Sequence, residues 1–260
     1  MSELLDKLER ASKGTVQPLG FGAANRREHV APMLLIGAVD AGDDAQAKLV
    51  GDAKLDGAIV LGLKPAKKAD VDKSTKSLNG TTIGVWHEEA TGKDPAGSDF
   101  QVFSADSTSM GSLSGDDRTI VMQVVPELDD SLLRTIDHLP VDAFLVSLAD
   151  ADSLTVAQLM RLARVRGVTS RWMLVLLGSL PTTEEMEQLR DAGVSAIVVN
   201  MAGQTKATLE SCLSALVELP HEPPERNKRR AVATLPSMPG PATPAPQRPE
   251  PDEDDDWEDD

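Results

Sequence analysis

The sequence contains no tyrosine, has a single cysteine, and is poor in aromatic residues, which make up 3 % of its 260 positions. One cysteine cannot build a disulfide framework within the chain or a cysteine-rich zinc module. The scarce aromatic residues offer little surface for stacking nucleic-acid bases and no indication of a stacking ligand. Hydrophobic residues still amount to 40 %, so we expect a sizeable core built from Val, Leu, Ile and Ala.

Basic residues are also scarce relative to acidic ones. There are 26 Lys and Arg against 42 Asp and Glu, which gives a formal net charge of −16. Sequence-independent binding of nucleic acid needs clustered Lys and Arg that displace counterions, so the balance argues against a nucleic-acid partner. The charge divides unevenly: about −10 falls in residues 1–219, +3 in residues 220–249 with their basic run at 226–230, and −9 in residues 250–260.

Long hydrophobic runs are missing as well. No apolar run reaches the roughly 18–20 residues that span a bilayer, and the N-terminus has no apolar core of signal-peptide type. We therefore expect a cytoplasmic protein without a membrane partner, with Cys212 reduced and buried in the last helix. Residues 220–260, rich in Pro and then in acids, carry too few large apolar residues to offset the entropy lost on ordering. This tail is predicted to be disordered and to offer a site for a protein partner.

Short apolar runs alternate with helical patterns along the first 219 residues. Most of the runs are continuous rather than alternating, which is typical of strands covered on both faces. The predicted strands are 33–39, 57–63, 82–87, 100–104, 119–125, 143–148, 172–177 and 196–200. The predicted helices between or after them are 45–55, 128–139, 154–166, 182–192 and 205–219.

Eight strands with intervening helices predict an α/β fold, a single (β/α)8 TIM-like barrel over residues 33–219. The alternative is a doubly wound open sheet, but eight consecutive units favour closure. Residues 1–32 hold an amphipathic helix and an apolar run at 15–22, expected to cap the barrel as a lid or to add a strand. The connections within 88–118 are rich in Gly, Ser and Asp, so either their helices are vestigial or these loops shape the top of the barrel.

Two stretches, Asp-Phe-Gln-Val-Phe at 99–103 and Leu-Thr-Val-Ala-Gln-Leu-Met at 154–160, resemble an uncharacterised bacterial (β/α)8-barrel family that also ends in a Pro-rich, acidic tail. That resemblance implies no activity. Residues 100–201 are more distantly similar to the metal-dependent 2-keto acid aldolase and citrate lyase β-subunit barrels. The similarity rests on the segments 121–125, 141–150 and 192–199.

The aldolase resemblance implies a Mg²⁺ site. In that family a glutamate at the end of the first segment and an aspartate at the end of the second bind the ion. Asp150 matches the aspartate, whereas Val125 stands where the glutamate is expected, and Glu127 would substitute from the loop. The arginine with which the family grips the keto acid has no evident counterpart in this sequence.

Positions at the carboxyl ends of the strands are the candidate functional residues, because barrel active sites lie there. The acidic ones among them could hold Mg²⁺, which prefers oxygen ligands and could polarise a carbonyl or stabilise an enolate. The alternative is a solvated acidic rim in which Asp caps helices. The candidates are Asp40, Lys64, His87, Glu88, Asp106, Glu127, Asp150 and Asn200.

Two of these candidates have a catalytic interpretation. His87, with Glu88 beside it, could act as a general base, and the alternative is a rim histidine bonded to a loop carbonyl. Lys64 could form a Schiff base if the barrel wall lowered its pKa. Other lysines follow it closely, so a basic, solvated helix face is the alternative there.

The loops after the seventh and eighth strands are a possible phosphate site, as in many barrels. In the second loop, Gly203 lies in a small-residue turn and Lys206 in the first turn of the next helix. Helix N-terminal N–H groups attract anions, although a plain turn followed by a helix cap explains the pattern equally well.

Two functions remain open on this basis. The first is a barrel that binds or converts a small anionic metabolite at the C-terminal face of its strands. A metal-assisted lyase or aldolase-like reaction is the most specific version of this function. The second is a non-catalytic scaffold or regulatory module whose tail is the interaction element. The reaction, the substrate and the oligomeric state stay open.

Overall fold

The computed structural model describes residues 2–14, 30–62, 78, 80–87, 98–109, 118–149 and 153–221. The chain divides into two units, residues 1–223 and 224–260. The predicted disorder of the tail and the apolar run at 15–22 lie outside the described residues, as does most of the connection within 88–118.

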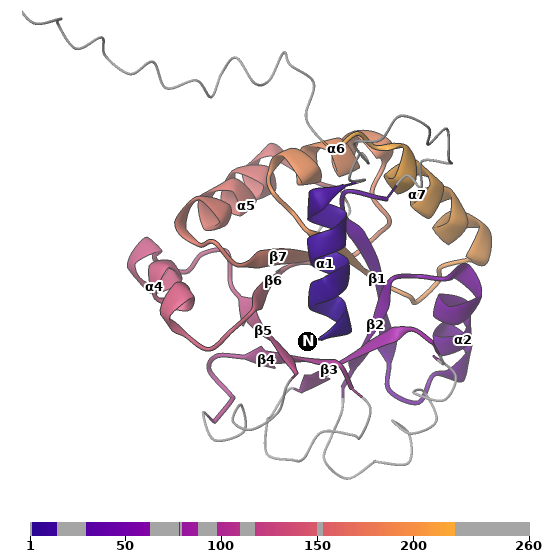
Figure 1. Ribbon diagram of the computed structural model, residues 1–260, viewed down its shortest axis with the longest axis horizontal. Helices are drawn as coiled ribbons and strands as arrows, with labels where there is room; N and C mark the ends of the chain where they lie inside the picture. The colour runs from indigo at the N-terminus through magenta and orange to yellow at the C-terminus, as the bar shows by residue number, and fades with distance from the viewer. Residues whose placement is uncertain are drawn as a thin grey trace, which may run out of the picture. The chain divides into compact units, whose positions relative to one another are not determined.

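Eight parallel strands close into one barrel, and each strand pairs with its neighbours in chain order (Figure 1). The strands are β1 (Leu34–Asp40), β2 (Gly57–Leu61), β3 (Thr82–His87), β4 (Phe100–Ser104), β5 (Thr119–Val124), β6 (Ala143–Leu148), β7 (Trp172–Leu177) and β8 (Ala196–Asn200). All eight predicted strands are therefore confirmed: five have the predicted ends, and the ends of the other three differ by one or two residues. Because β8 pairs with β1, the open-sheet alternative is wrong.

Described helices cover part of the barrel wall, and one crosses its end. They are α1 (Glu3–Lys13), α2 (Asp44–Ala53), α4 (Asp130–Thr135), the 3₁₀ helix η2 (Ile136–His138), α5 (Val156–Val168), α6 (Thr183–Asp191) and α7 (Lys206–Glu218). Within the described part of the chain, none of the helices is long and apolar enough to cross a membrane.

Alternate strand residues form two separate apolar layers, as the two-residue period of a strand requires. One set, including Ile36, Val102 and Leu145, packs inside the barrel. The other set, including Leu35 and Val146, packs against the surrounding helices. The interior is filled with side chains, so the barrel is a packed core and not a pore.

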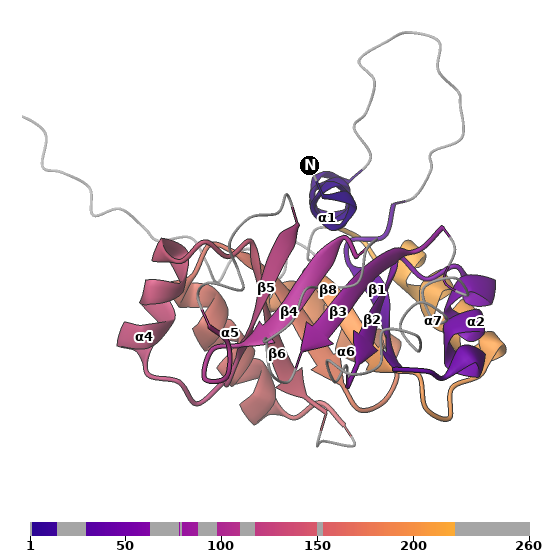
Figure 2. The ribbon, with the colours of Figure 1, turned by 90° about the horizontal axis from the view of Figure 1, so that it is seen from below.

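Helix α1 lies across the N-terminal end of the barrel (Figures 1 and 2). Its buried face, Leu4, Leu8 and Ala11, belongs to the interior apolar cluster. Lys7 fixes the helix to the barrel rim, because its Nζ donates to the carbonyl oxygen of Asp56 at 2.8 Å and to Thr82 Oγ1 at 2.6 Å. A ligand would thus approach the barrel from the opposite end, where the strands finish.

Every second strand is preceded by a short polar residue at this closed end. These residues are Asp56, Asp99, Asp142 and Ser195, before β2, β4, β6 and β8. Asp56 accepts the N–H of Leu35 at 2.8 Å, and Asp142 accepts the N–H of Ile120 at 2.9 Å. Asp99 bonds instead to the start of α1. The carboxylates thereby satisfy backbone donors that the strand ladders leave open.

Candidate functional site at the barrel mouth

The carboxyl ends of the strands place a ring of inward-facing positions at the mouth of the barrel. By the alternation that buries Val102, Val121 and Leu174, the last inward residue of each strand lies at this opening. The ring comprises Asp40, Leu61, Trp86, Ser104, Gln123, Ser147, Leu176 and Asn200. Asp40 is its charged member, and the others are apolar or neutral polar residues.

A cavity of about 410 Å³ opens at this mouth. Leu61, Trp86 and Leu176 supply its apolar walls, while Gln123 and two serines supply amide and hydroxyl groups. Its described lining residues are Leu61, Gly62, Trp86, Ser104, Ser107, Gln123 and Leu176. Small-molecule sites are typically concave, of about 300–1,000 Å³, and mostly apolar with a few polar groups, which is the composition found here.

A second hollow, which we call the β5–β6 groove, has a volume of about 480 Å³ and runs from the mouth over the ends of β5 and β6 to helix α5. Gln123 lines both the groove and the mouth cavity, so the two hollows meet at this side chain. Glu127 and Arg161 are charged residues of the groove, and their side chains form an ion pair at 3.1 Å. Its lining residues are Gln123, Val124, Val125, Pro126, Glu127, Ser147, Leu148, Gln158 and Arg161.

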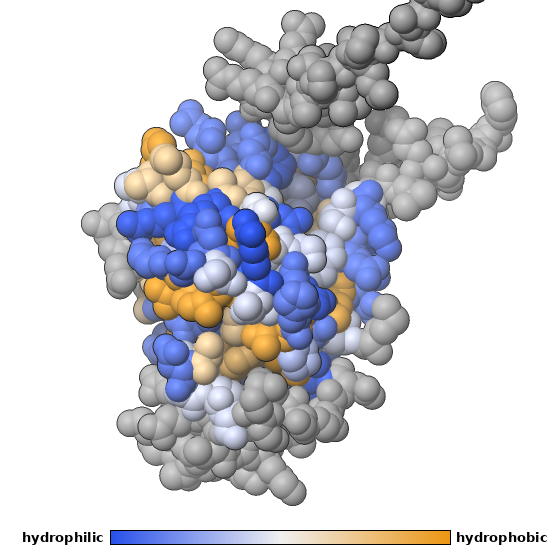
Figure 3. Space-filling view, turned by 90° about the vertical axis from the view of Figure 1, so that its left-hand side faces the viewer, coloured by the Kyte–Doolittle hydropathy of each residue, from blue (hydrophilic) through white to orange (hydrophobic). Residues whose placement is uncertain are grey.

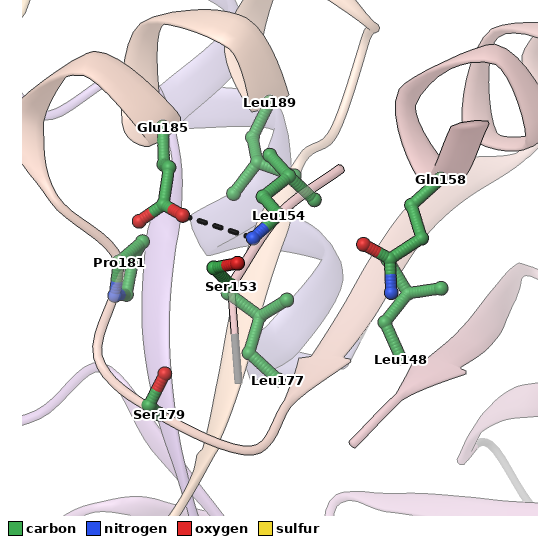
Figure 4. Close-up of a pocket in the computed structure, with 9 residues that line it drawn as sticks. All are labelled: Leu148, Ser153, Leu154, Gln158, Leu177, Ser179, Pro181, Glu185 and Leu189. Atoms are coloured by element: carbon green, nitrogen blue, oxygen red, sulfur yellow. Dashed lines mark hydrogen bonds between the residues drawn. The ribbon is translucent and has the colours of Figure 1, made fainter. Parts of the chain in front are cut away.

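A third hollow lies between the starts of α5 and α6, but it has room for about 20 Å³ only (Figure 4). This volume is enough for about one water molecule. Glu185 crosses it and accepts the N–H groups of Thr182 at 2.8 Å and Leu154 at 2.9 Å. These bonds, first that of Thr182 and then that of Leu154, lower the pKa of Glu185 below its ordinary value. The hollow is a structural joint rather than a ligand site.

The described acidic candidates at the strand ends do not converge on a common point. Asp40 is exposed and bonds to Gln46 of α2, whose Nε2 donates to its carboxylate at 3.4 Å. Asp106 is exposed in the loop after β4. Glu127 pairs with Arg161. Among the described residues there is no group of three or more metal-ligating side chains.

Other candidates lie outside the described residues. Lys64, Glu88 and Asp150 belong to this group, and of His87 only the backbone, which ends β3, is described. The catalytic assignments of His87 and Lys64 therefore stay predictions. The same holds for Mg²⁺ at Glu127 and Asp150, because Asp150 lies outside the described residues. Glu127 itself forms an ion pair with Arg161.

The predicted phosphate loop after β8 is a compact turn that opens α7. Gly203 adopts a φ of 74°, a conformation that suits glycine. Thr205 caps the helix by accepting the N–H of Thr208, and Lys206 lies 3.7 Å from Glu210 on the exposed helix face. Neither Gly203 nor Lys206 lines the mouth cavity or the groove. A role for these two residues in holding phosphate stays a prediction.

Trp86 is one of the mouth residues that sequence reasoning missed. The low aromatic content gave no indication of a stacking ligand, yet this indole faces the cavity at the end of β3. The signal was present in the strand itself, because residues 82, 84 and 86 share one face of β3. The barrel topology then directs that face inward.

The fold defines the chain as a (β/α)8 barrel, and solved structures of that architecture superimpose on it. No protein-family model and no curated protein matches the sequence. The solved structures described next are distant in sequence, so they show the fold alone.

One similar structure is (S)-3-O-geranylgeranylglyceryl phosphate synthase from Thermoplasma acidophilum in complex with its substrate sn-glycerol-1-phosphate. It has a TM-score of 0.59 and 12 % identity, and the match covers 84 % of this chain and 100 % of that one. Thiamine phosphate pyrophosphorylase from Pyrococcus furiosus has a TM-score of 0.56 and 11 % identity, over 71 % and 96 % of the two chains. KGPDC from Streptococcus mutans has a TM-score of 0.53 and 9 % identity, over 72 % and 97 %.

Proposed function

We propose that this protein binds a small metabolite with an anionic group, a phosphate or a carboxylate, at the mouth of the barrel. The observation that carries the proposal is the cavity of about 410 Å³, whose described lining residues are all uncharged. A carboxylate in the lining would repel an anion that enters the cavity, and the described lining contains none. The side chain of Gln123 and the hydroxyls of Ser104 and Ser107 can donate hydrogen bonds to its oxygens.

The apolar wall of the cavity fits the rest of such a molecule. Trp86, Leu61 and Leu176 present an indole and two aliphatic side chains toward the opening. An indole buries a large area and offers a flat face, so it favours a ligand with a carbon skeleton over a bare inorganic ion. Helix α1 covers the other end of the barrel, which leaves this mouth as the route of entry.

The structural neighbours support the anionic character of the ligand at the level of fold analogy. The Thermoplasma acidophilum structure contains sn-glycerol-1-phosphate, and the Pyrococcus furiosus protein is named for a phosphate compound. Ligands of (β/α)8 barrels are held at the C-terminal face of the strands, where the cavity lies here. Fold analogy alone does not assign function, so the proposal depends on the cavity.

Tryptophan fluorescence tests the proposal, because two of the three tryptophans lie at opposite ends of the barrel. Trp86 lines the mouth, whereas Trp172 begins β7 at the closed end. The double variant W172F/W257F leaves Trp86 as the single reporter, and W86F/W257F leaves Trp172 as the matched control. We expect sn-glycerol 1-phosphate, or another member of a panel of phosphorylated and carboxylate metabolites, to shift the Trp86 emission and raise the melting temperature. The Trp172 emission should not change. If no compound alters either signal, the proposed function is wrong.

A further inference from the structure

The mouth cavity and the β5–β6 groove meet at one side chain. Gln123, the last inward residue of β5, lines both hollows. Trp86 lies on β3, two strands away around the barrel, and neighbouring strands are separated by about 4.8 Å. The path from Trp86 to Gln123 is therefore on the order of 10 Å, and the groove continues beyond Gln123 to helix α5. A ligand that fills both hollows has to be elongated.

The two hollows differ in chemistry. The mouth cavity has its apolar wall of Trp86, Leu61 and Leu176, and the described part of its lining contains no charged residue. The groove contains Glu127 and Arg161, together with the amide of Gln158. One end of the combined space thus favours an apolar or planar group, and the other end favours a charged one.

Arg161 is available to a ligand because its present partner is weakly held. The ion pair with Glu127 is exposed on both sides, with 49 % of the arginine and 58 % of the glutamate side chain accessible. Exposed pairs of this kind contribute little stability, so an incoming carboxylate or phosphate can take the place of Glu127. A guanidinium is also well suited to hold either group through two parallel hydrogen bonds.

The neighbouring arginine of α5 is not available in the same way. Arg164 donates to Asp130 at 2.7 Å and to the carbonyl oxygen of Leu128 at 2.7 Å, and so ties the helix to the loop after β5. These bonds hold the loop after β5 in place beside the groove.

Figure 3 shows the side of the molecule that carries α4 and α5, where apolar side chains reach the surface in patches between polar ones. The exposed large apolar residues of α4, α5 and the loop after β5 are Val125, Leu132, Val156 and Met160.

From these relationships we infer that the mouth cavity and the β5–β6 groove are one two-part site for an elongated organic anion. The apolar or planar end packs against Trp86, the middle passes Gln123, and the carboxylate or phosphate binds Arg161 in place of Glu127. This inference rests on the proposed function and adds the class of the ligand and the direction in which it lies.

A series of ω-phenylalkanoic acids of increasing chain length, with the matching ω-phenylalkanols, tests this arrangement in the full-length protein. Binding is followed by the emission of Trp86 in the W172F/W257F background. We expect the acids to bind best at an intermediate chain length, and the best acid to bind about tenfold more tightly than its alcohol, because a hydrogen-bonded charge is added at Arg161. Arg161→Gln should remove this preference for the acid and leave the affinity for the alcohol unchanged.

Two further variants test the direction of the effect on acid binding and provide a control. Glu127→Gln removes the competing carboxylate and should strengthen acid binding severalfold. Arg166→Gln removes the same charge from the far end of α5, where Arg166 bonds to the carbonyl oxygen of Arg171, and should leave acid binding unchanged. Acid binding that is seen at Trp86 but is insensitive to Arg161→Gln would overturn the two-part site and leave the proposed function standing. Absence of any Trp86 response to acids, alcohols and phosphorylated metabolites would overturn both.

Discussion

Gly84 of β3 and Phe100 of β4 lie directly opposite each other in the barrel wall, and the ring of Phe100 occupies the space that a side chain on Gly84 would need. Phe100 is completely buried and is one of the largest residues of the interior. The small residue on one strand thus makes room for the large one on the next, which is how a narrow barrel fills its centre without voids.

This pair predicts opposite effects for two glycine-to-alanine changes. Gly84→Ala should lower the free energy of unfolding by about 1–3 kcal/mol, because the new methyl group overlaps a buried ring. Gly167→Ala is the matched control, since Gly167 lies in α5 and the added carbon has no described atom within 4 Å apart from its chain neighbours and the backbone of its own helix. There the change should stabilise by about 0.5–1 kcal/mol. Urea unfolding of both variants measures the difference. A Gly84→Ala protein as stable as the wild type would contradict the packing described here.

We expect Asp99 to hold the start of α1 on the barrel. Its carboxylate accepts the hydroxyl of Ser2 at 2.7 Å and the N–H groups of Glu3 at 2.8 Å and Leu4 at 2.9 Å, so a residue at the start of β4 caps a helix that is distant in sequence. Asp99→Ala should cost about 1–2 kcal/mol, as the loss of a helix cap does. Hydrogen exchange should show faster exchange throughout α1.

A local cap provides the control for this change. Asp43 caps α2 by accepting the N–H groups of Ala45 and Gln46. Asp43→Ala should also lower the free energy of unfolding, but exchange in α1 should stay slow. Equal protection of α1 in the two variants would mean that Asp99 does not hold this helix.

We expect the stabilising contribution of Asp137 to be lost in acid. It accepts the hydroxyl of Thr169 at 2.7 Å and the N–H of Ser170, and these bonds, that of Thr169 first, lower the pKa of its carboxyl below the ordinary value. Stabilisation from a lowered pKa is present above the unfolded-state value, near 4, and disappears as the pH falls through the folded-state value. Asp137→Asn should therefore be less stable than the wild type at pH 7, and the two proteins should converge in acid. Unfolding curves at several pH values measure this difference.

For Asp56 we expect the contribution to stability to change with pH in the opposite direction. Burial raises the pKa of its carboxyl, and the N–H of Leu35 and the charge of Lys7 offset this effect only in part. A raised pKa means that the folded state holds its proton more firmly, so this contribution is complete below the unfolded-state value and is lost as the pH rises through the folded-state value. Relative to wild type, Asp56→Asn should thus gain stability between acid and neutral pH, whereas Asp137→Asn should lose it. A relative stability of Asp56→Asn that falls with rising pH would contradict this assignment.

The strands could be predicted from sequence because most of them are short, continuous apolar runs bounded by turn residues. Helix 128–139 was predicted less well: the structure divides it into α4 and the 3₁₀ helix η2. Asp129 caps the first piece by accepting the N–H of Ser131, which delays the start to Asp130. Asp137 in the second piece bonds to Thr169 and Ser170, and such a contact between distant segments leaves no local pattern.

The location of the candidate site could also be predicted, but its composition could not. Barrel topology indicates the carboxyl ends of the strands, where titratable residues such as Glu127 and Asp106 are the candidates that the sequence offers. The described lining of the cavity consists instead of uncharged residues, Trp86 and Gln123 among them. Arg161 reaches the groove from a helix, and only the packing of α5 beside the loop after β5 brings it to Glu127.

We expect the carboxylate of Glu185 to hold two neighbouring loops together at the open end of the barrel. One carboxylate oxygen accepts the N–H of Thr182, at the start of α6. The other accepts the N–H of Leu154, just before α5 (Figure 4). Glutamine has one acceptor oxygen and would turn its NH₂ group toward the second N–H. Glu185→Gln should therefore cost about 1–2 kcal/mol and speed exchange of the Leu154 amide hydrogen, because a backbone donor loses its partner.

The neighbouring residue gives a matched control for this joint. Glu184 lies in the same turn of α6 and is exposed, so Glu184→Gln changes the net charge equally without removing either bond. Its unfolding curve and Leu154 exchange should match those of the wild type. Because the pKa of Glu185 is lowered, the stability difference between Glu185→Gln and wild type should be present at pH 7 and should shrink as the pH falls below the ordinary glutamate value. A difference that is constant from neutral pH into acid would show that the ionised carboxylate is not what joins the two loops.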